Sequence, residues 1–391
     1  MAYDVVIWCP DRHIVYDGDT PYQRGVGGGI TARVRMARAL ARRGHRVTLA
    51  CNCLRRCLID GVEYIPLDDV NARTADVLML NTTGGDLSLR PSLSAHLQGR
   101  FRIVWAQGAQ MPDALHEIGF DCLYCGSNFI SGVARERWGV HPRGIFVAYN
   151  TYEEALFASA ENRGVDRDEM RLVYFSHPSK GLETAVAITR AVRALDPRFH
   201  LVVFGSEALW GGADGRREDE AGVSFRGMIG QAQLAPELLM SAYAIQMEAL
   251  EEASALSISE ALRAGCVVIG SPVGCYPEMI REGENGFLIP GSHTSTSAIH
   301  SAVGIIASIA GSPVTRERIR KVAMAAPWSS DTMAAAWEGH WDWWFDGGRR
   351  EEGSAEPCSV CSGATLSLAD GLHCLDCSSY RAKVTQPAGV G

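Results

Sequence analysis

Two glutamates eight positions apart, Glu252 and Glu260, mark the stretch of the chain best suited to chemistry. Around the second glutamate, residues 256–262 place apolar side chains on one face of a helix. Ser254 is suited to cap the start of that helix, and Gly265 stands where a glycine often ends one. The pattern therefore predicts Glu252 in the loop before a short helix and Glu260 on the body of that helix.

The start of this predicted helix is a candidate anion site. Its first backbone N–H groups, near Ala255 and Leu256, have no partner within the helix and can face an anion. A diphosphate at the helix end, with a carboxylate on either side to accept hydrogen bonds from sugar hydroxyls, would make a nucleotide-sugar site. The alternative is an ordinary surface helix with two solvated glutamates, and the spacing alone favours this alternative.

The whole stretch of residues 248–290 resembles the donor-site motif of family 4 glycosyltransferases, which have the GT-B fold. In that family a glutamate, seven residues and a second glutamate precede an apolar strand, a Gly/Pro turn and a Gly-Phe-Leu-Ile-Pro ending. The matching positions are Glu252, Glu260-Ala261, Ala264-Gly265, Val267–Gly270, Gly274, Pro277-Glu278 and Gly286–Pro290. The resemblance implies that Glu260 binds ribose hydroxyls and that Glu252 binds the donor sugar.

Other donor contacts are implied around the same site. Lys180 stands at a predicted strand-to-helix turn, where the family places a lysine on the diphosphate. The family also has an arginine several residues earlier, but here Ser176 or His177 stands near that place. The family's stretch beside the nucleotide base matches Phe225–Ile229, so we expect Met228 to contact the donor.

A glycine loop near the N-terminus provides a second candidate for binding. A strand at Asp4–Cys9 precedes the pair Gly28-Gly29, which opens a helix, and a further strand follows at His45–Cys51. This order is typical of a doubly wound domain, and the resemblance implies donor contacts at both glycines. Where the family often has a histidine after a later strand, this chain has Gln107, which could bind a sugar hydroxyl.

The alternation of strands and helices continues along the chain and predicts an α/β protein with two Rossmann-like domains facing across a cleft. The predicted boundaries are 1–158 for the acceptor-side domain, 170–330 for the donor domain and 331–346 for a crossover helix. In the first domain, helices are expected at 93–97, 113–118 and 129–138 and a strand at Cys122–Cys125. In the second domain, a helix is expected from Leu182 to Leu195, where Asp196-Pro197 ends it. The first long helix should bury Val34, Ala37, Leu40 and Ala41 and leave Arg35, Arg38 and Arg42 on its other face.

Composition restricts the class of protein. The 391 residues are 47% hydrophobic and 21% charged, which is typical of a globular protein with more than one domain. The net charge of −8 argues against nucleic-acid binding. No apolar run is long enough to cross a membrane and the N-terminus does not resemble a signal peptide, so we expect a cytoplasmic protein whose cysteines are reduced or metal-bound.

The C-terminal segment carries a separate signal. Cys358 and Cys361 form one Cys-x2-Cys pair, Cys374 and Cys377 form another, and twelve residues lie between the pairs. This spacing predicts a zinc ribbon at 357–380 with a closed, structural four-sulfur site. The polar segment 347–356 should set the ribbon apart as a tail that could contact a protein partner. Cysteines elsewhere are expected to be small buried hydrophobes and not metal ligands.

The function that these observations predict is transfer of a sugar from a nucleotide-activated donor to an unknown acceptor. The resemblance implies retention of anomeric configuration, no catalytic metal, and Lys180 and Glu252 as the catalytic side chains. Two alternatives stay open. One is a GT-B epimerase or hydrolase acting on sugar nucleotides, and the other is a non-catalytic GT-B scaffold that uses the zinc tail for interaction.

Overall fold

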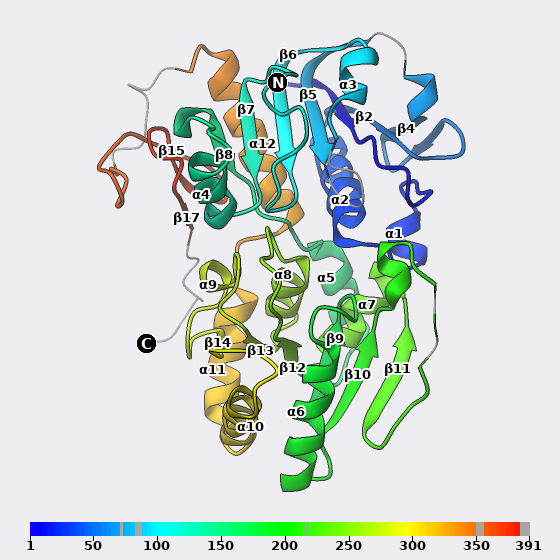
Figure 1. Cartoon of the computed structure of the whole chain (residues 1–391), viewed down its shortest axis with the longest axis vertical. Coiled ribbons are helices and arrows are strands. Elements are labelled where there is room, and N and C mark those ends of the chain that lie inside the picture. Colours follow the sequence, from blue (N-terminus) through cyan, green and yellow to red (C-terminus); the bar gives the residue numbers. More distant parts are fainter. Residues whose placement is uncertain (71–72, 83–87, 214, 216, 349–355, 384–391) are drawn as a thin grey trace. The chain divides into compact units, whose positions relative to one another are not determined.

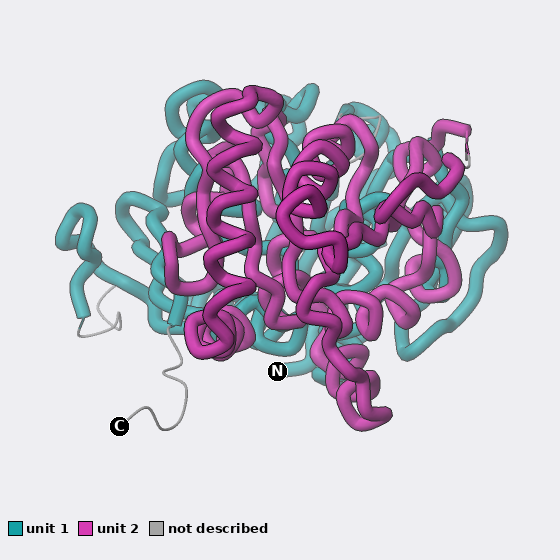
Figure 2. Tube along the Cα trace, turned by 90° about the horizontal axis from the view of Figure 1, so that it is seen from below, with its two compact units in different colours: residues 1–20, 27–151, 327–383 teal, residues 21–26, 152–326, 384–391 magenta. Residues whose placement is uncertain are grey.

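The computed structural model describes residues 1–70, 73–82, 88–213, 215, 217–348 and 356–383. These residues form two compact units, which are coloured separately in Figure 2. Unit 1 contains residues 1–20, 27–151 and 327–383, and unit 2 contains 21–26 and 152–326. Most of the predicted linker at 347–356 lies outside the described residues.

Unit 1 is built on an eight-stranded sheet with the order β3-β4-β2-β1-β5-β6-β7-β8. All neighbours are parallel except β3 and β4, which form an antiparallel pair. The strands are β1 (Asp4–Trp8), β2 (Arg46–Cys51), β3 (Cys57–Ile59), β4 (Val62–Pro66), β5 (Arg73–Thr82), β6 (Leu97–Ala106), β7 (Cys122–Cys125) and β8 (Ile145–Val147). The helices are α2 (Gly28–Arg42), α3 (Pro91–Ser94), α4 (Asn128–Glu136) and α12 (Ser330–Phe345), with 3₁₀ turns η1 (Leu67–Asp69) and η2 (Pro142–Gly144).

Two predicted helices of this unit are wrong or displaced. Residues 113–118 form turns, because Ala114 has a φ of +65°, which an α-helix does not allow. The helix expected at 93–97 is α3, which starts earlier because Pro91 takes its first turn. His96 follows it with a φ of +49°, and Leu97 already opens β6. Turn geometry therefore overrode the apolar spacing in both places.

Helix α2 buries two arginines, although the sequence predicted a solvated arginine face. Arg33 is 0% and Arg35 is 1% exposed, and the guanidinium of Arg35 donates a hydrogen bond to the carbonyl of Thr151. Arg38 is also largely covered and pairs with Asp60, so Arg42 is the most exposed of the three arginines expected outside. Arg33 likewise donates a hydrogen bond to the side-chain carbonyl of Asn81, so both buried guanidinium groups have partners inside unit 1.

Unit 2 is an all-parallel six-stranded sheet with the order β11-β10-β9-β12-β13-β14. Its strands are β9 (Asp168–Phe175), β10 (His200–Phe204), β11 (Val223–Gly227), β12 (Ser241–Gln246), β13 (Val267–Gly270) and β14 (Gly286–Leu288). Its helices are α5 (Glu154–Asn162), α6 (Leu182–Leu195), α7 (Gln231–Leu239), α8 (Leu256–Arg263), α9 (Tyr276–Met279), α10 (Thr296–Ala310) and α11 (Pro313–Met324), with a 3₁₀ turn η3 (Glu207–Trp210). Helices α6 and α10 pack side by side (Figure 1).

Residues 20–23 form the short helix α1 (Thr20–Gln23). Within unit 2, the main chain of this helix at Tyr22 packs on the start of α7, because a Cβ on Gly230 would lie 2.0 Å from the carbonyl oxygen of Tyr22. In the described part of the chain, no single helix is long and apolar enough to cross a membrane, and α10 and α11 pass that test only as a pair bent by 105°.

The last described segment is a three-stranded antiparallel sheet of β15 (Thr365–Ser367), β16 (Gly371–Cys374) and β17 (Tyr380–Ala382). It belongs to unit 1 and lies beside α4 and β8 (Figure 1). Asn128 at the start of α4 accepts a hydrogen bond from the Tyr380 amide at 2.7 Å and donates one to the Tyr380 carbonyl at 3.0 Å. The prediction of a tail set apart from the two domains is therefore wrong.

Candidate functional site

The predicted donor residues of unit 2 gather at the carboxyl ends of its parallel strands. Lys180 follows β9, Met228 follows β11, and Glu252 follows β12. Because all six strands run in the same direction, these loops meet at one edge of the sheet, where α/β proteins commonly bind ligands. Gly28 and Gly29 belong to unit 1, where they begin α2 behind Gly27.

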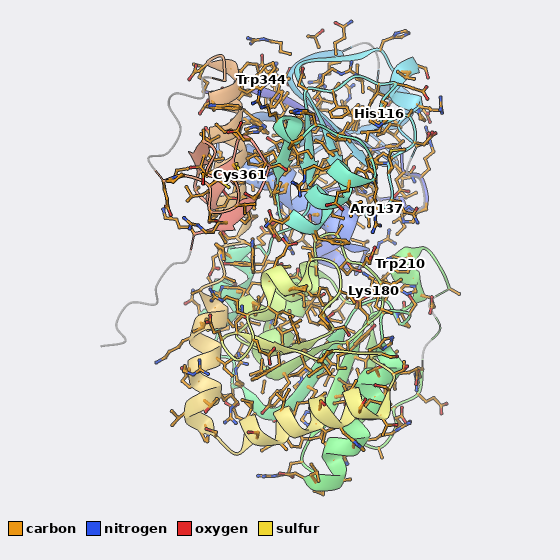
Figure 3. All side chains as sticks on the ribbon, turned by 60° about the vertical axis from the view of Figure 1, so that its left-hand side comes forward. His116, Arg137, Lys180, Trp210, Trp344 and Cys361 are labelled. Carbon is orange, nitrogen blue, oxygen red and sulfur yellow. The ribbon has the colours of Figure 1, made fainter. Side chains whose placement is uncertain are left out.

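Lys180 and Glu252 form an ion pair. Their side chains are 17% and 19% exposed, so the pair is mostly covered but not sealed from solvent. Burial alone would lower the pKa of Lys180, but the carboxylates around it, first that of Glu252, outweigh burial and raise the pKa. Lys180 therefore carries a positive charge at the edge of the sheet, and Figure 3 shows its position.

Two glycines bring the loops of this pair together. Gly181 has a φ of +90°, and a Cβ there would lie 1.9 Å from the carbonyl oxygen of Met247. Gly274 has a φ of +52°, and a Cβ there would lie 2.3 Å from the carbonyl oxygen of Glu252. The same carbonyl accepts a hydrogen bond from the Cys275 amide at 2.9 Å. Any other residue at either position would push the Glu252 loop away.

Helix α8 begins one residue later than the sequence indicated. Ala255, and not Ser254, occupies the cap position, and no side chain caps the helix. Gly265 ends it as predicted, with a φ of +73° and its amide bonded to the Leu262 carbonyl at 2.9 Å. Leu256 is the first helical residue, so the N–H groups near Ala255 and Leu256 stay candidates for binding an anion.

Glu260 lies on α8 and is 3% exposed. A solvated surface glutamate would be far more exposed, so the structure disfavours that alternative for Glu260. Glu252 is likewise engaged with Lys180 and not free in solvent. The structure thus places one carboxylate in an ion pair and the other in the body of the helix that follows.

The sequence did not single out Glu248, which is the most perturbed acid of this site. It is 2% exposed and accepts a hydrogen bond from the Tyr276 hydroxyl, while its amide donates to the Ser271 hydroxyl at 3.0 Å. Burial, and then the neighbouring charge of Glu252, raise the pKa of Glu248 to about 8. A carboxyl with that pKa holds its proton at neutral pH. Its only sequence signal is its place four residues before Glu252.

The loop after β9 contains a second group of ordered side chains around His177. The imidazole of His177 stacks on the indole of Trp210, with ring centroids 3.8 Å apart. Its Nε2 lies 2.9 Å from the Glu207 carboxylate, and its Nδ1 lies 2.8 Å from the Ser179 hydroxyl. Burial, followed by the charge of Lys180, lowers the pKa of His177. His177 is therefore neutral at pH 7 and does not supply the charge of the family's arginine.

The other predicted donor contacts, Ser176, Met228 and Gln107, each lie against another part of the chain. The Ser176 carbonyl lies against Gly205, since a Cβ there would be 2.4 Å from that oxygen. Met228 packs against Gly25 of the glycine loop, where an added Cβ would lie 3.0 Å from the Met228 Cβ. In unit 1, the Gln107 side-chain amide exchanges two hydrogen bonds with the side-chain amide of Asn150, at 3.2 and 2.9 Å. Gln107 would have to give up this partner to bind a sugar.

The four ribbon cysteines come together as predicted. Their sulfurs all lie within 4.8 Å of one another, with 3.7 Å between Cys358 and Cys377 and 3.6 Å between Cys361 and Cys374. A tetrahedral ion with metal–sulfur bonds of about 2.3 Å requires sulfurs about 3.8 Å apart. The four sulfurs could therefore hold a metal ion. Among the described residues no other group of three or more such side chains is close enough to do so.

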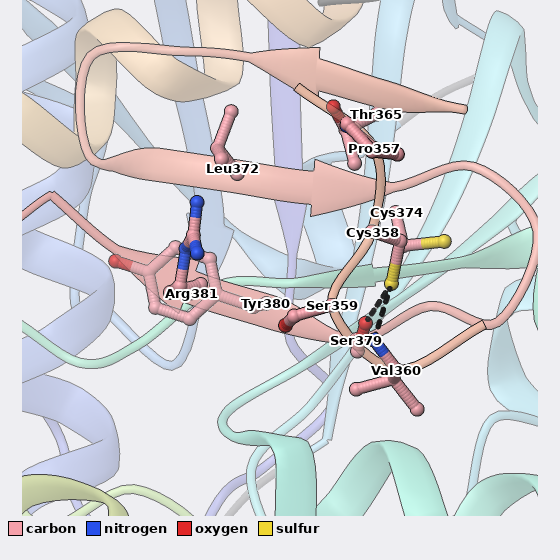
Figure 4. A pocket seen from close by; sticks show the side chains of 10 residues that line it. All are labelled: Pro357, Cys358, Ser359, Val360, Thr365, Leu372, Cys374, Ser379, Tyr380 and Arg381. Carbon is pink, nitrogen blue, oxygen red and sulfur yellow. Dashed lines mark hydrogen bonds between the residues drawn. The ribbon is translucent and has the colours of Figure 1, made fainter. Parts of the chain in front are cut away.

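Backbone amides support this cluster. The amides of Val360, Gly363 and Asp376 each donate to a cysteine sulfur at 3.4 Å, and the amide of Cys377 donates at 3.3 Å. Such contacts stabilise thiolates, the form that binds a metal. Figure 4 shows the Cys358 sulfur beside Ser379 and Val360 in the wall of a small pocket of the ribbon.

Part of unit 2 matches a known protein family. Residues 171–306, from β9 into α10, match the family described as Glycosyl transferases group 1. This stretch is a glycosyltransferase domain. It contains Lys180, Glu252 and Glu260, together with the loops that Gly181 and Gly274 bring into contact. No curated protein matches the chain.

Solved structures share the fold of the chain. Sucrose-phosphate synthase from Thermosynechococcus elongatus is 17% identical with a TM-score of 0.64, over 88% of this chain and 99% of that one. AviGT4, a glycosyltransferase involved in avilamycin A biosynthesis, is 17% identical with a TM-score of 0.62, over 88% and 98%. HepE of Anabaena in complex with UDP-glucose is 16% identical with a TM-score of 0.58, over 84% and 97%. The likeness establishes the GT-B fold.

Proposed function

We propose that the protein transfers a sugar from a nucleotide-activated donor to an acceptor, with the donor held at the Lys180–Glu252 edge of unit 2. The observation that carries this proposal is a mostly buried lysine–glutamate ion pair beside an uncapped helix start, inside the stretch that matches a glycosyltransferase family. Solved proteins of the same fold bind UDP and UDP-glucose, which supports a nucleotide sugar as the donor.

Each side chain has a role that follows from its charge. The diphosphate of the donor would take Lys180 from Glu252 and accept hydrogen bonds from the amides near Ala255 and Leu256. Negative charge grows on the diphosphate as the sugar leaves, so a fixed cation at that position lowers the barrier of the step. Glu252, once released, would accept hydrogen bonds from the donor sugar, and Glu260 would bind the ribose.

We further propose that anomeric configuration is retained, as the resemblance to family 4 glycosyltransferases implies. No divalent cation is needed in this proposal, because Lys180 and the helix start provide the positive charge that such a cation would supply. Gly28, Gly29, Ser176 and Met228 are proposed as additional donor contacts. We also propose a cytoplasmic location, where the cysteines, free in the described part of the chain, would be reduced or metal-bound. An epimerase or hydrolase of the same fold would differ in its products, which assays with and without acceptor separate.

The ribbon is proposed to hold one structural Zn²⁺ through Cys358, Cys361, Cys374 and Cys377. Four thiolates fill a tetrahedral coordination sphere, so the ion would have no open position for substrate. When bound, zinc would offset two of the four thiolate charges and fix the two Cys-x2-Cys turns. We also propose that the ribbon contacts a protein partner. The ribbon presents an exposed apolar side chain, Val360, which is 72% exposed.

A thermal-shift experiment on the full chain tests the donor site. UDP, ADP and GDP, and their glucose conjugates, would each be added to the wild-type protein. Binding to the native state alone raises Tm, and a ligand at 100 times its Kd contributes about 2.7 kcal/mol. We expect at least one nucleoside diphosphate to raise Tm, and Lys180→Ala to reduce the shift. The matched control is Lys321→Ala, an exposed lysine of α11 in the same unit. If none of these compounds raises Tm, the proposed function is wrong.

A further inference from the structure

Trp210 is an exposed aromatic side chain next to the proposed donor site. It is 48% exposed, which is unusual for tryptophan, and the Lys180 Nζ lies 5.5 Å from its ring centroid. Figure 3 shows the two side chains near each other in unit 2. Its place beside the lysine that we assign to the diphosphate indicates a role beyond packing.

The indole is held from one side by His177. The two rings lie 12° from parallel, and both ring nitrogens of His177 already have partners in Glu207 and Ser179. His177 is 6% exposed, so its imidazole is a fixed support on one face of the indole. The imidazole covers one face of the indole, and Trp210 keeps 48% of its surface exposed with the Lys180 Nζ over its ring. A ring fixed in this way loses little conformational freedom when a second ring stacks on it.

The backbone that carries Trp210 is also fixed. The Ser206 hydroxyl accepts a hydrogen bond from the Ala208 amide at 3.2 Å at the start of η3. Gly211 closes the turn with a φ of +83° and an amide hydrogen bond to the Ala208 carbonyl at 3.1 Å. Gly205, with a φ of +121°, allows the end of β10 to lie against Ser176, which precedes His177. The turn that carries Trp210 and the loop that carries His177 therefore pack directly on each other.

The order of strands decides which part of a donor would meet Trp210. Trp210 follows β10, which lies between β9, the strand before Lys180, and β11, the strand before Met228. Glu252, assigned to the donor sugar, follows β12 on the other side of β9. A donor with its diphosphate on Lys180 and its sugar toward Glu252 can place its base past the end of β10, while its ribose meets Glu260 on α8, the helix that packs against α7.

We propose that Trp210, stacked on His177, is the platform on which the planar base of the donor nucleotide lies. This inference rests on the proposed function and adds to it a residue that contributes to recognition of the nucleoside. Every base has a flat π face, so the platform contributes affinity for nucleotides in general, and edge contacts elsewhere would choose among bases.

The test compares three ligands on wild type, Trp210→Ala and Trp210→Leu. The ligands are inorganic pyrophosphate, the nucleoside diphosphate that shifts Tm most, and its sugar conjugate. Stacking on an aromatic side chain typically changes affinity by about 5- to 100-fold per base. We expect a loss of that size for the nucleoside diphosphate and an equal loss for the sugar conjugate, while pyrophosphate binding is unchanged. Trp210→Leu keeps apolar bulk without a π face and should behave like Trp210→Ala.

The controls separate this inference from the proposed function. Leu195→Ala removes an apolar side chain that is 65% exposed in the same unit, and it should change no affinity. If wild type binds the nucleoside diphosphate and both Trp210 variants bind it equally well, the platform is wrong and the proposed function stands. A loss confined to the sugar conjugate would assign Trp210 to the sugar and overturn the inference. Wild type that binds no nucleoside diphosphate at all would overturn both.

Discussion

The proposed donor edge of unit 2 and the cysteine cluster of unit 1 both concentrate ionisable side chains, but they balance charge in different ways. At the donor edge a lysine and a glutamate neutralise each other and remain partly open to solvent. In the ribbon, four cysteines of the same chemistry lie within 4.8 Å, an arrangement that suits thiolates only around a cation. The first arrangement can exchange partners, and the second is closed.

The difference has an energetic basis. A mostly buried ion pair gains little over its desolvation cost, so it contributes weakly to stability. An incoming diphosphate can therefore take Lys180 from Glu252 at modest cost, because one opposite charge replaces another. A metal bound by four thiolates has no comparable substitute, and loss of the metal leaves the ligands without their organising centre. We expect substitutions to affect folding at the ribbon and binding or turnover at the donor edge.

The largest expected effect is loss of the ribbon in the double variant Cys361→Ser, Cys374→Ser. Removing two of four ligands should abolish metal binding, and a three-stranded sheet of this size has too little core to fold alone. Phe146 stacks on His373 with ring centroids 4.2 Å apart, and it would lose this packing contact when the ribbon unfolds. We expect unit 1 to lose about 2–4 kcal/mol of stability. Metal analysis and thermal unfolding measure both effects.

The control for this variant is Cys57→Ser, which changes a cysteine of unit 1 outside the cluster. It should retain the metal content and the Tm of wild type. Donor binding by unit 2 should survive in both variants, because none of its candidate residues lies in the ribbon. Retention of one metal ion per chain in the double variant would rule out the four-cysteine site.

Lys180→Ala should cause the next largest effect, now on turnover. Removing one fixed donor that stabilises developing charge typically lowers kcat by about 100- to 1,000-fold. Affinity for the free nucleoside should fall much less, because leaving-group charge is greatest in the transition state. Steady-state kinetics on Lys180→Ala and on the control Lys321→Ala would measure both quantities. An unchanged kcat would exclude Lys180 from the mechanism.

Much of the fold could be predicted from local pattern. Helix α6 occupies the predicted residues Leu182–Leu195, because apolar spacing, a glycine before it and Asp196-Pro197 after it all agree. Strand β7 also has its predicted bounds, Cys122–Cys125. Residues 113–118 failed because a left-handed residue at Ala114 breaks a helix that apolar spacing favours. Local rules worked where capping and spacing agreed and failed where one turn residue decided the conformation.

The site was predictable only in part, for a related reason. Glu252, Glu260 and Lys180 stand at motif positions, so a linear pattern identifies them. Glu248 and Trp210 owe their interest to burial and stacking, which depend on residues distant in sequence, such as Tyr276. The docking of the ribbon also depends on a distant partner, Asn128. Such properties arise from tertiary contacts, which spacing along the chain does not encode.

Glu248→Gln should reveal the buried proton through the pH dependence of stability. The pKa of Glu248 is raised from 4.5 to about 8, first by burial and then by Glu252. Between these two values the native state holds a proton that the unfolded state has released, so stability falls as pH rises, by at most about 1.4 kcal/mol per pH unit. Below pH 4.5 both states are protonated, and above about 8 the loss is complete.

Glutamine has no such proton, so the variant should gain stability relative to wild type by about 2–3 kcal/mol between pH 6 and pH 8. Urea unfolding of both proteins at several pH values would measure this difference. The control is Glu284→Gln, whose side chain is 58% exposed and whose loss should change the free energy of unfolding by less than about 1 kcal/mol. Parallel curves for wild type and Glu248→Gln would mean that Glu248 is ionised at neutral pH.

The smallest expected effect belongs to Glu260, because it is assigned to ribose hydroxyls and not to the reacting centre. Glu260→Ala should weaken donor binding and kcat/KM by about 1–3 kcal/mol, the cost of leaving hydrogen-bonding groups unpaired. The side chain is 3% exposed, so alanine could also loosen α8. Glu260→Gln keeps the volume and one acceptor oxygen and should lose less. Kinetics over a range of donor concentrations, with Tm measured alongside, separate recognition from folding. Wild-type kinetics in a folded Glu260→Ala protein would remove this glutamate from the donor site, whereas Lys180 and Glu252 would keep their assignment.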